Sequence, residues 1–440
     1  MWWPLTNPRS ARAEVGDAGR SRGETQTELW HLPAVWKRAF SRLYDELELP
    51  TSGLTPHAHQ GLVLLGTLVP FAKAAQHLHT LLNVQVSTST TRRLTEQAGA
   101  CLQHWQDQQA QPLREAPASE EETPARLVLA TDGVLIAVRP REWAEVKMTT
   151  IGAVGQPRKQ GEPHCEQLSY FARLSDAATF GDLASGEIKR RGVAQAQEVA
   201  AINDGAEWIP ACVQSQRADA LRILDFAHAA AYVSDIGTLA QQAGVELAPS
   251  WLAEQWHTRK WEGPRAVLAE VERLSVLAPS SAMAEKVAYL RKREGQMQYP
   301  QYLADGWPIG SGMAESGNKL VVQARLKGAG MHWERTQVNP MLALRTTLSS
   351  DRWTQDWQVV RADSRTRRLQ RFRTRSQMAR DKAVRRLQET FFRLPLPLLL
   401  AFFPTPPPPK AAKGRTEGQK RWGRQTFSPR AIQEGRFAKK

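Results

Sequence analysis

Two aspartates stand in matching contexts, each directly after a run of apolar residues and directly before a glycine. Asp132 closes the run in "RLVLATDG", and Asp204 closes the run in "EVAAINDG". A single Asp-Gly pair is typical of a simple turn, but two pairs that each end an apolar strand favour a shared site. Because ligand sites in α/β sheets form beyond strand ends, we expect Asp132 and Asp204 to face one crevice.

A third acid, Glu315, lies in the glycine-containing stretch "GWPIGSGMAES". The glycines allow a sharp turn, and Ser311 is a suitable N-cap for a helix with Glu315 in its first turn. An acid at that position can also simply stabilise a helix N-terminus. Three carboxylates in one crevice repel each other unless a cation lies between them. Asp132, Asp204 and Glu315 are therefore candidate catalytic residues and candidate metal ligands.

The metal that this set of ligands predicts is Mg²⁺, which Mn²⁺ can replace. Mg²⁺ prefers a few carboxylate oxygens together with water and phosphate. Two such ions about 4 Å apart stabilise the attacking and leaving oxygens of an in-line phosphoryl transfer. The sequence contains no His/Cys cluster with zinc spacing. We therefore expect two Mg²⁺ ions and phosphoryl-transfer chemistry.

A polar insertion, "DFAH" at 225–228, interrupts a further apolar run. Asp225 and His228 are three residues apart at an expected strand-to-helix junction, where they could hydrogen-bond locally or face the same crevice. A helix-capping role explains Asp225 by itself. His228 could orient a carboxylate or contact phosphate.

The elements that position these residues follow a recognisable order. Apolar segments predict three strands in meander order, at 125–139, 144–155 and 166–175. A helix, a buried strand within 197–209, a short helix and a strand that continues into a helix come next. This order predicts a ribonuclease H-like mixed sheet of the α/β class in a domain at 126–350. The pattern at about 249–299 is helical only, which predicts an all-helical insertion.

The segment 31–105 has the periodicity of helices. The helix "PFAKAAQHLHTLL", the turn "NVQV" and a following helix capped by Ser87 or Thr88 have the spacing of a helix-turn-helix, whose second helix enters the major groove of DNA. Its first turns would expose Thr90, Thr91, Arg92 and Arg93. An ordinary three-helix bundle has the same pattern. Arg92 and Arg93 are the candidate DNA-binding residues here.

Charge is distributed unevenly along the chain, which has 440 residues and a formal net charge of +15. Residues 351–440 contain 23 Lys and Arg against 7 Asp and Glu, whereas the first 350 contain 36 against 37. A basic tail at 351–440 predicts contacts with the phosphates of double-stranded DNA. We expect residues 1–30 to be disordered and residues 106–125 to form a linker.

Three further basic residues, Lys319, Arg325 and Lys327, follow Glu315. Their spacing suggests that they line one side of the helix and bind DNA phosphates that lead into the crevice.

Compartment and membrane contact are constrained by two other features. Three widely spaced cysteines make a disulfide framework improbable and fit a reducing cytoplasm. The N-terminus lacks a signal-peptide core, and the apolar stretch at 394–403 is short and broken by proline. We expect a cytoplasmic protein without a membrane partner.

Four motifs together closely resemble the DDE transposases of bacterial insertion sequences, in particular the ISKra type. They are "ATDGV", "NDGAEWI", "ILDFAHAAAYV" and "YPQYLADGWPIGSGMAESGNKLVVQARLKGAGMHW". The resemblance runs from about residue 70 to residue 353, and the last motif is long enough to be specific. It implies a ribonuclease H-like core with a helical insertion, and assembly as a homo-oligomer.

The resemblance also implies roles for particular residues. Asp132, Asp204 and Glu315 match the metal-binding triad, and Asp225 and His228 match an accessory Asp-x-x-His signature. Asp225 also ends a strand, so it could replace Asp204 as the second ligand. The Gly-following context of Asp204 favours Asp204, because it mirrors that of Asp132.

The expected function is Mg²⁺-dependent cleavage of DNA at terminal inverted repeats, followed by strand transfer into target DNA. Two alternatives stay open. A domesticated or decayed copy would bind DNA without cutting it, and a nuclease of the same fold would cut without joining strands.

Overall fold

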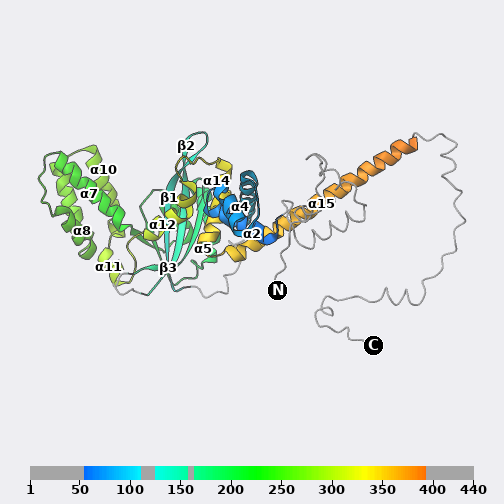
Figure 1. Cartoon of the computed structure of the whole chain (residues 1–440). Coiled ribbons are helices and arrows are strands. Elements are labelled where there is room, and N and C mark those ends of the chain that lie inside the picture. The colour runs from blue at the N-terminus through cyan, green and yellow to red at the C-terminus, as the bar shows by residue number, and fades with distance from the viewer. Residues whose placement is uncertain (1–53, 111–123, 157–162, 393–440) are drawn as a thin grey trace, which may run out of the picture. The chain divides into compact units, whose positions relative to one another are not determined.

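The structure is a computed structural model that describes residues 54–110, 124–156 and 163–392 (Figure 1). A division between two units falls after Arg368, and the packing described below concerns the residues before it. The expected disorder at 1–30 and the apolar stretch at 394–403 lie outside the described residues. None of the helices in the described ranges is long and apolar enough to cross a membrane.

A five-stranded mixed sheet forms the centre, in the order β3-β2-β1-β4-β5. Its strands are β1 (Arg126–Val138), β2 (Glu142–Val154), β3 (Cys165–Arg173), β4 (Glu198–Asn203) and β5 (Leu221–Leu224). β1 pairs antiparallel with β2 and parallel with β4. β2 pairs antiparallel with β3, and β4 pairs parallel with β5. The predicted strands and the α/β class are thus confirmed.

The first half of β1, from Leu127 to Thr131, is buried on both faces, which explains its almost continuous apolar sequence. Leu127 and Leu129 pack on one face with Phe180, which belongs to α5 (Ala177–Arg190). Val128 packs on the other face with Val233, which belongs to α7 (Phe226–Gln242). The short helix α6 (Ile209–Gln216) lies between β4 and β5 in the chain. Successive side chains of β1 therefore point to opposite faces of the sheet and pack into two separate hydrophobic cores.

The segment expected to be an all-helical insertion is helical throughout. Its elements are α8 (Trp251–Trp261), α9 (Pro264–Leu277), α10 (Ser281–Lys292), η3 (Glu294–Gln296) and α11 (Tyr299–Ala304). Val271, Leu290 and Tyr299 pack with Val233 of α7 in one hydrophobic cluster. The apolar stripes of these helices bury one another and pack against α7.

The N-terminal helices are α2 (Pro56–Leu68), α3 (Phe71–Leu82) and α4 (Thr88–Ala110). α3 ends at Asn83, which adopts the left-handed conformation. Ser87 Oγ accepts a hydrogen bond from Thr90 N at 3.1 Å, as expected of an N-cap. Thr91, expected to be exposed, is instead buried and donates its hydroxyl proton to Ser87 O.

α4 connects these helices to the rest of the unit. It continues to Ala110, so the first five residues of the expected linker are helical, and 111–123 lie outside the described residues. Gly99 packs against the backbone of Pro340 in α14 (Arg335–Ser349). Arg173 of β3 donates to Asp107 Oδ1 at 2.9 Å. The helical region and the sheet therefore share one packed interior.

The remaining helices follow the insertion. They are α12 (Gly312–Gly317), the π-helix η4 (Asn318–Gln323), α13 (Ala324–Leu326), α14 and α15 (Trp353–Phe392). The basic segment after residue 351 is helical from Trp353 as far as Phe392.

Candidate carboxylate site beside the end of β4

Asp132 lies in the middle of β1, opposite Met148 of β2, and not at a strand end as predicted. The reason is that β1 pairs with β2 as far as Val138, whereas its pairing with β4 stops at Leu129 and Ala201. Asn203 Oδ1 then accepts a hydrogen bond from Thr131 N at 2.8 Å. β4 therefore ends alongside the middle of β1, and Asp204 follows directly.

The electrostatics of Asp132 show that the two aspartates are neighbours. Burial raises the pKa of the Asp132 carboxyl above its usual value. The backbone N–H of Gly133, 2.7 Å from Oδ1, acts in the opposite direction. The negative charges of Asp204 and Glu145 raise the pKa further. A cation at this position would relieve the repulsion between the two aspartates.

Asn318 lies closest to Asp132 from the helical side. Its Nδ2 donates to Asp132 Oδ2 at 2.7 Å, and its Oδ1 is buried without a hydrogen-bond partner among the described residues. The preceding Gly317 permits this close approach, since a Cβ there would lie 2.9 Å from Met148 Cε. Asn318 was not among the residues expected at the site. Its place three residues after Glu315, one helical turn further on, was the available signal.

Glu315 takes a different position. Its side chain is 70% exposed, and its Oε1 lies 2.6 Å from Lys319 Nζ. Within the described residues, no three His, Cys, Asp or Glu side chains are grouped closely enough to hold a metal ion. The structure thus brings Asp132 and Asp204 together and leaves the Glu315 side chain exposed and paired with Lys319.

Asp225 is the N-cap of α7 and is buried. Its Oδ1 accepts from His228 N at 2.7 Å. Its Oδ2 accepts from both Ser311 N at 2.5 Å and Ser311 Oγ at 2.8 Å. Ser311, predicted to cap α12, makes no side-chain cap bond to that helix. Asp225 therefore fixes the turn before α12, and because three donors occupy its oxygens, the geometry favours Asp204 as the partner of Asp132.

His228 belongs to an aromatic cluster that braces Asp204. Its ring centroid lies 5.2 Å from that of Tyr232 and 6.1 Å from that of Tyr289. The Tyr289 hydroxyl donates to Asp204 O at 2.5 Å, and burial raises the pKa of Tyr289 to about 12. Tyr289 therefore stays protonated and keeps donating at neutral pH. α10 thus supports the Asp204 turn.

The turn itself requires Gly205, whose φ is +81°. Arg293 Nη2 donates to Gly205 O at 2.6 Å, and its guanidinium lies 3.7 Å from the Tyr289 ring centroid. The helical insertion therefore contributes directly to the site through Tyr289 and Arg293.

Of the predicted DNA-contacting residues, Arg92, Arg93, Lys319 and Lys327 are exposed. Arg92 pairs with Glu96 at 2.9 Å. The prediction that Arg325 binds DNA phosphates is wrong, because its side chain is buried and only 3% exposed. Lys319 is exposed and Arg325 is buried, so the two side chains do not line one solvent-facing side of the helix.

Arg325 instead makes its contacts inside the protein. Its Nε donates to Gly66 O at 3.1 Å, and its guanidinium lies 4.8 Å from the ring centroid of Phe71 and 5.0 Å from that of Trp333. Burial and the nearby charge of Arg345 lower its pKa to about 10. It remains protonated at neutral pH and ties the helix after Glu315 to α2.

The donor atoms at the site are oxygens of Asp132 and Asp204, with the Asn318 amide beside them. Mg²⁺ typically binds one or two protein carboxylates and completes its shell with water and phosphate. The two aspartates fit that requirement, and the buried Asn318 Oδ1 supplies a further unused acceptor. A third carboxylate from Glu315 is not part of this arrangement.

A scan against models of known protein families and a search among curated proteins gave no match for this chain.

Proposed function

We propose that this protein is a DNA transposase of the DDE class, which cleaves DNA at the ends of an insertion sequence and joins the freed strand to target DNA. The observation that carries the proposal is the meeting of Asp132 and Asp204 beside the end of β4, under the helix that bears Asn318 and Glu315. The strand order, with β1 antiparallel to β2 and parallel to β4, supports a ribonuclease H-like core.

Asp132 and Asp204 hold Mg²⁺ in this proposal, and Mg²⁺ supplies charge stabilisation for the attacking and leaving oxygens. Asn318 orients Asp132, while Tyr289 and Arg293 hold the Asp204 turn. Glu315 would join the two aspartates by exchanging its ion pair with Lys319 for a contact with the cation. An exposed i,i+4 ion pair contributes only about 0.3–0.5 kcal/mol, so a divalent cation can compete for Glu315.

Double-stranded DNA is the proposed partner, through two surfaces. α3 and α4 act as a helix-turn-helix that recognises terminal inverted repeats, with Arg92 and Arg93 at the exposed start of α4. Lys319 and Lys327, both exposed, contact phosphates near the carboxylate site. A homo-oligomer brings two DNA ends together.

The test is a cleavage and strand-transfer assay on duplexes taken from the borders of the gene, with MgCl₂, MnCl₂ or EDTA. We expect Asp132→Asn and Asp204→Asn each to lower the cleavage rate at least about a hundredfold, since loss of even an outer-shell partner of a metal costs about 10- to 100-fold. Asp235→Asn is the matched control, because Asp235 lies on α7, is 56% exposed and pairs with Lys286 of α10. Full activity of Asp204→Asn would refute the proposal.

The Glu315–Lys319 ion pair also favours a second candidate, a protein that binds DNA without cutting it. Wild-type protein that binds the same duplexes in EDTA but yields no nicked product in either metal would support that candidate. Nicked DNA without a strand-transfer product would indicate a nuclease of the same fold.

A further inference from the structure

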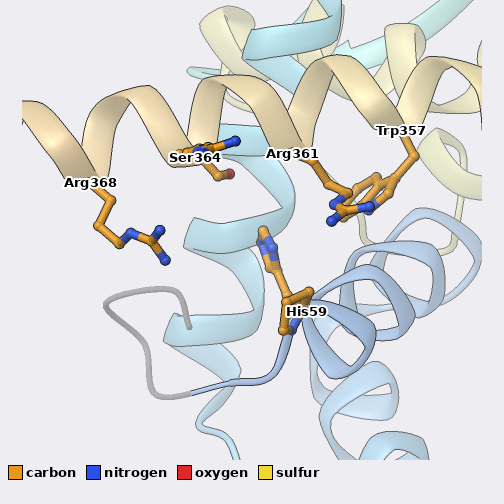
Figure 2. A pocket seen from close by; sticks show the side chains of 7 residues that line it. His59, Trp357, Arg361, Ser364 and Arg368 are labelled. Carbon is orange, nitrogen blue, oxygen red and sulfur yellow. The ribbon is translucent and has the colours of Figure 1, made fainter. Parts of the chain in front are cut away.

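A small cavity lies between the N-terminus of α2 and one face of α15, far along the chain from the carboxylates (Figure 2). Its volume is about 40 Å³. A cavity needs about 10–15 Å³ to hold one water molecule, so this one accommodates a group of a few heavy atoms. Its lining residues are Pro56, His59, Trp357, Arg361, Ser364, Arg365 and Arg368.

The residues from α15 occupy one helical face. Arg361, Ser364, Arg365 and Arg368 are spaced i, i+3, i+4 and i+7, which places them in one row. Figure 2 shows His59 of α2 opposite this row. Three guanidinium groups and a hydroxyl group thus converge on the cavity. None of its seven lining residues, all within the described ranges, is acidic.

The wall from α2 adds to the positive potential. α2 begins at Pro56 and has 13 residues, and Thr55 Oγ1 caps it by accepting from Ala58 N at 3.2 Å. A helix N-terminus carries about half a positive elementary charge. The floor is rigid, because His59 meets the buried Trp357 edge-on at 5.5 Å and Trp357 stacks on Trp353 at 5.5 Å.

We propose that this cavity binds a phosphate group, and that the phosphate belongs to the backbone of double-stranded DNA. Guanidinium groups bind phosphate through paired, charge-assisted hydrogen bonds. The volume suits the oxygens of one phosphate and is too small for a nucleotide base. The chain beyond Arg368 adds further basic residues, including Arg371, Arg373 and Arg375, which favours a long polyanion over a free ion.

The inference rests on the proposed function only for the choice of DNA as the phosphate source. Its test therefore uses equilibrium binding in EDTA, where no cleavage occurs. The probe is a fluorescent 30-bp duplex of arbitrary sequence, because a phosphate contact is independent of sequence. The full chain is compared with Arg365→Gln and with the double variant Arg361→Gln/Arg365→Gln at several salt concentrations.

The matched control is Arg367→Gln. Arg367 also lies on α15 and loses the same charge on substitution, but it pairs with Asp363 at 2.7 Å and does not line the cavity. Arg365 is exposed, so its substitution leaves the fold intact.

We expect each cavity variant to weaken duplex binding about three- to tenfold and to reduce the slope of log affinity against log salt by about 1, with a smaller effect for Arg367→Gln. Equal affinities of cavity variants and control would overturn the site. Unchanged duplex binding, together with loss of thermal stabilisation by inorganic phosphate in Arg365→Gln, would overturn the assignment to DNA. If the cavity variants behave as expected and wild-type protein does not cut, the proposed function fails and the phosphate site stands.

Discussion

The pKa of Asp132 is set by effects that act in opposite directions. Burial and the charges of Asp204 and Glu145 favour its protonated form, whereas Gly133 N–H and Asn318 favour the carboxylate. The Asn318 amide donates its hydrogen bond at 2.7 Å, at a place where a third carboxylate would increase the repulsion. Asn318 therefore allows the two aspartates to stay together in the absence of a cation.

Substitution of Asn318 by Asp tests this balance without an activity assay. We expect Asn318→Asp to lower the free energy of unfolding in EDTA by about 2 kcal/mol, because a hydrogen bond to a charged group is replaced by a like-charge contact. We also expect Mg²⁺ to raise the Tm of the variant more than that of the wild type, because binding to the folded state stabilises it. Thermal unfolding in EDTA and in MgCl₂ measures both effects.

The exchange variant Asp132→Asn/Asn318→Asp is the control, since it keeps one amide and one carboxylate in contact. Its Tm in EDTA should stay close to that of the wild type. A single variant Asn318→Asp with unchanged Tm in both solutions would show that Asn318 is not coupled to the carboxylates.

At the scale of elements, the segment after Glu315 decides which side chains reach the sheet. η4 is a π-helix, and such turns shift the faces of a helix relative to a regular α-helix. Asn318 points to Asp132, Glu315 pairs with Lys319 in solvent, and Arg325 enters the interior. Asp225 fixes the start of this segment through Ser311. The site is thus assembled by the helix α12–η4 as much as by the strands.

The contact between α4 and α14 offers a prediction at the same scale. A Cβ at Gly99 would lie 2.4 Å from Pro340 O, and a backbone atom cannot turn away as a side chain can. We expect Gly99→Ala to destabilise the protein by about 1–3 kcal/mol through overpacking, which outweighs the gain of about 0.5–1 kcal/mol that alanine brings to a helix. Chemical denaturation measures the change.

Gly61 in α2 is the matched control, because the nearest atom to a Cβ there is Leu78 Cδ1 at 4.0 Å. Gly61→Ala should therefore stabilise the protein by about 0.5–1 kcal/mol. The same sign for both substitutions would contradict the close packing of α4 on α14.

At the scale of the whole molecule, residues far apart in the chain share one cooperative structure. His59 of α2 packs against Trp357 of α15, and Arg173 of β3 bonds to Asp107 of α4. Unfolding of α2 therefore exposes groups that the rest of the unit keeps from water, and a titration at His59 changes the stability of that unit.

The pH dependence of unfolding provides the whole-molecule prediction. Burial lowers the pKa of His59 from 6.5 to about 4, so the unfolded chain takes up a proton in a range where the folded chain does not. The neutral His59 side chain therefore contributes to the free energy of unfolding. This contribution is fully present above pH 6.5 and is lost as the pH falls to about 4, to a total of about 3 kcal/mol. His59→Phe keeps an aromatic ring beside Trp357 but cannot take up a proton. We expect this variant to lack the decrease in unfolding free energy that His59 causes below pH 6.5.

Urea denaturation between pH 7.5 and 4.5 measures the difference in unfolding free energy between wild type and variant. That difference should change with pH mainly below 6.5. A pH-independent difference would show that His59 titrates normally in the folded protein.

Local sequence patterns determined a large part of the architecture. The three N-terminal strands, the helix-only segment at 249–299 and the Ser87 cap could be predicted because apolar periodicity and capping chemistry act over a few neighbouring residues. The two Asp-Gly contexts likewise predicted that Asp132 and Asp204 would be neighbours. The parallel pairing of β1 with β4 brings them near each other, although β1 continues past Asp132 to Val138.

Tertiary structure decided what depends on distant partners. Asp132 lies within β1 because β2 extends the pairing beyond the end of β4. Arg325 is buried because the backbone of α2 and two aromatic rings supply its contacts, and Asn318 faces Asp132 where Glu315 was expected. Charge and periodicity indicate how a side chain behaves in water. Its burial and its hydrogen bonds are set by its neighbours in the fold, and some of these come from distant segments, as Gly66 does for Arg325 and Asn318 for Asp132.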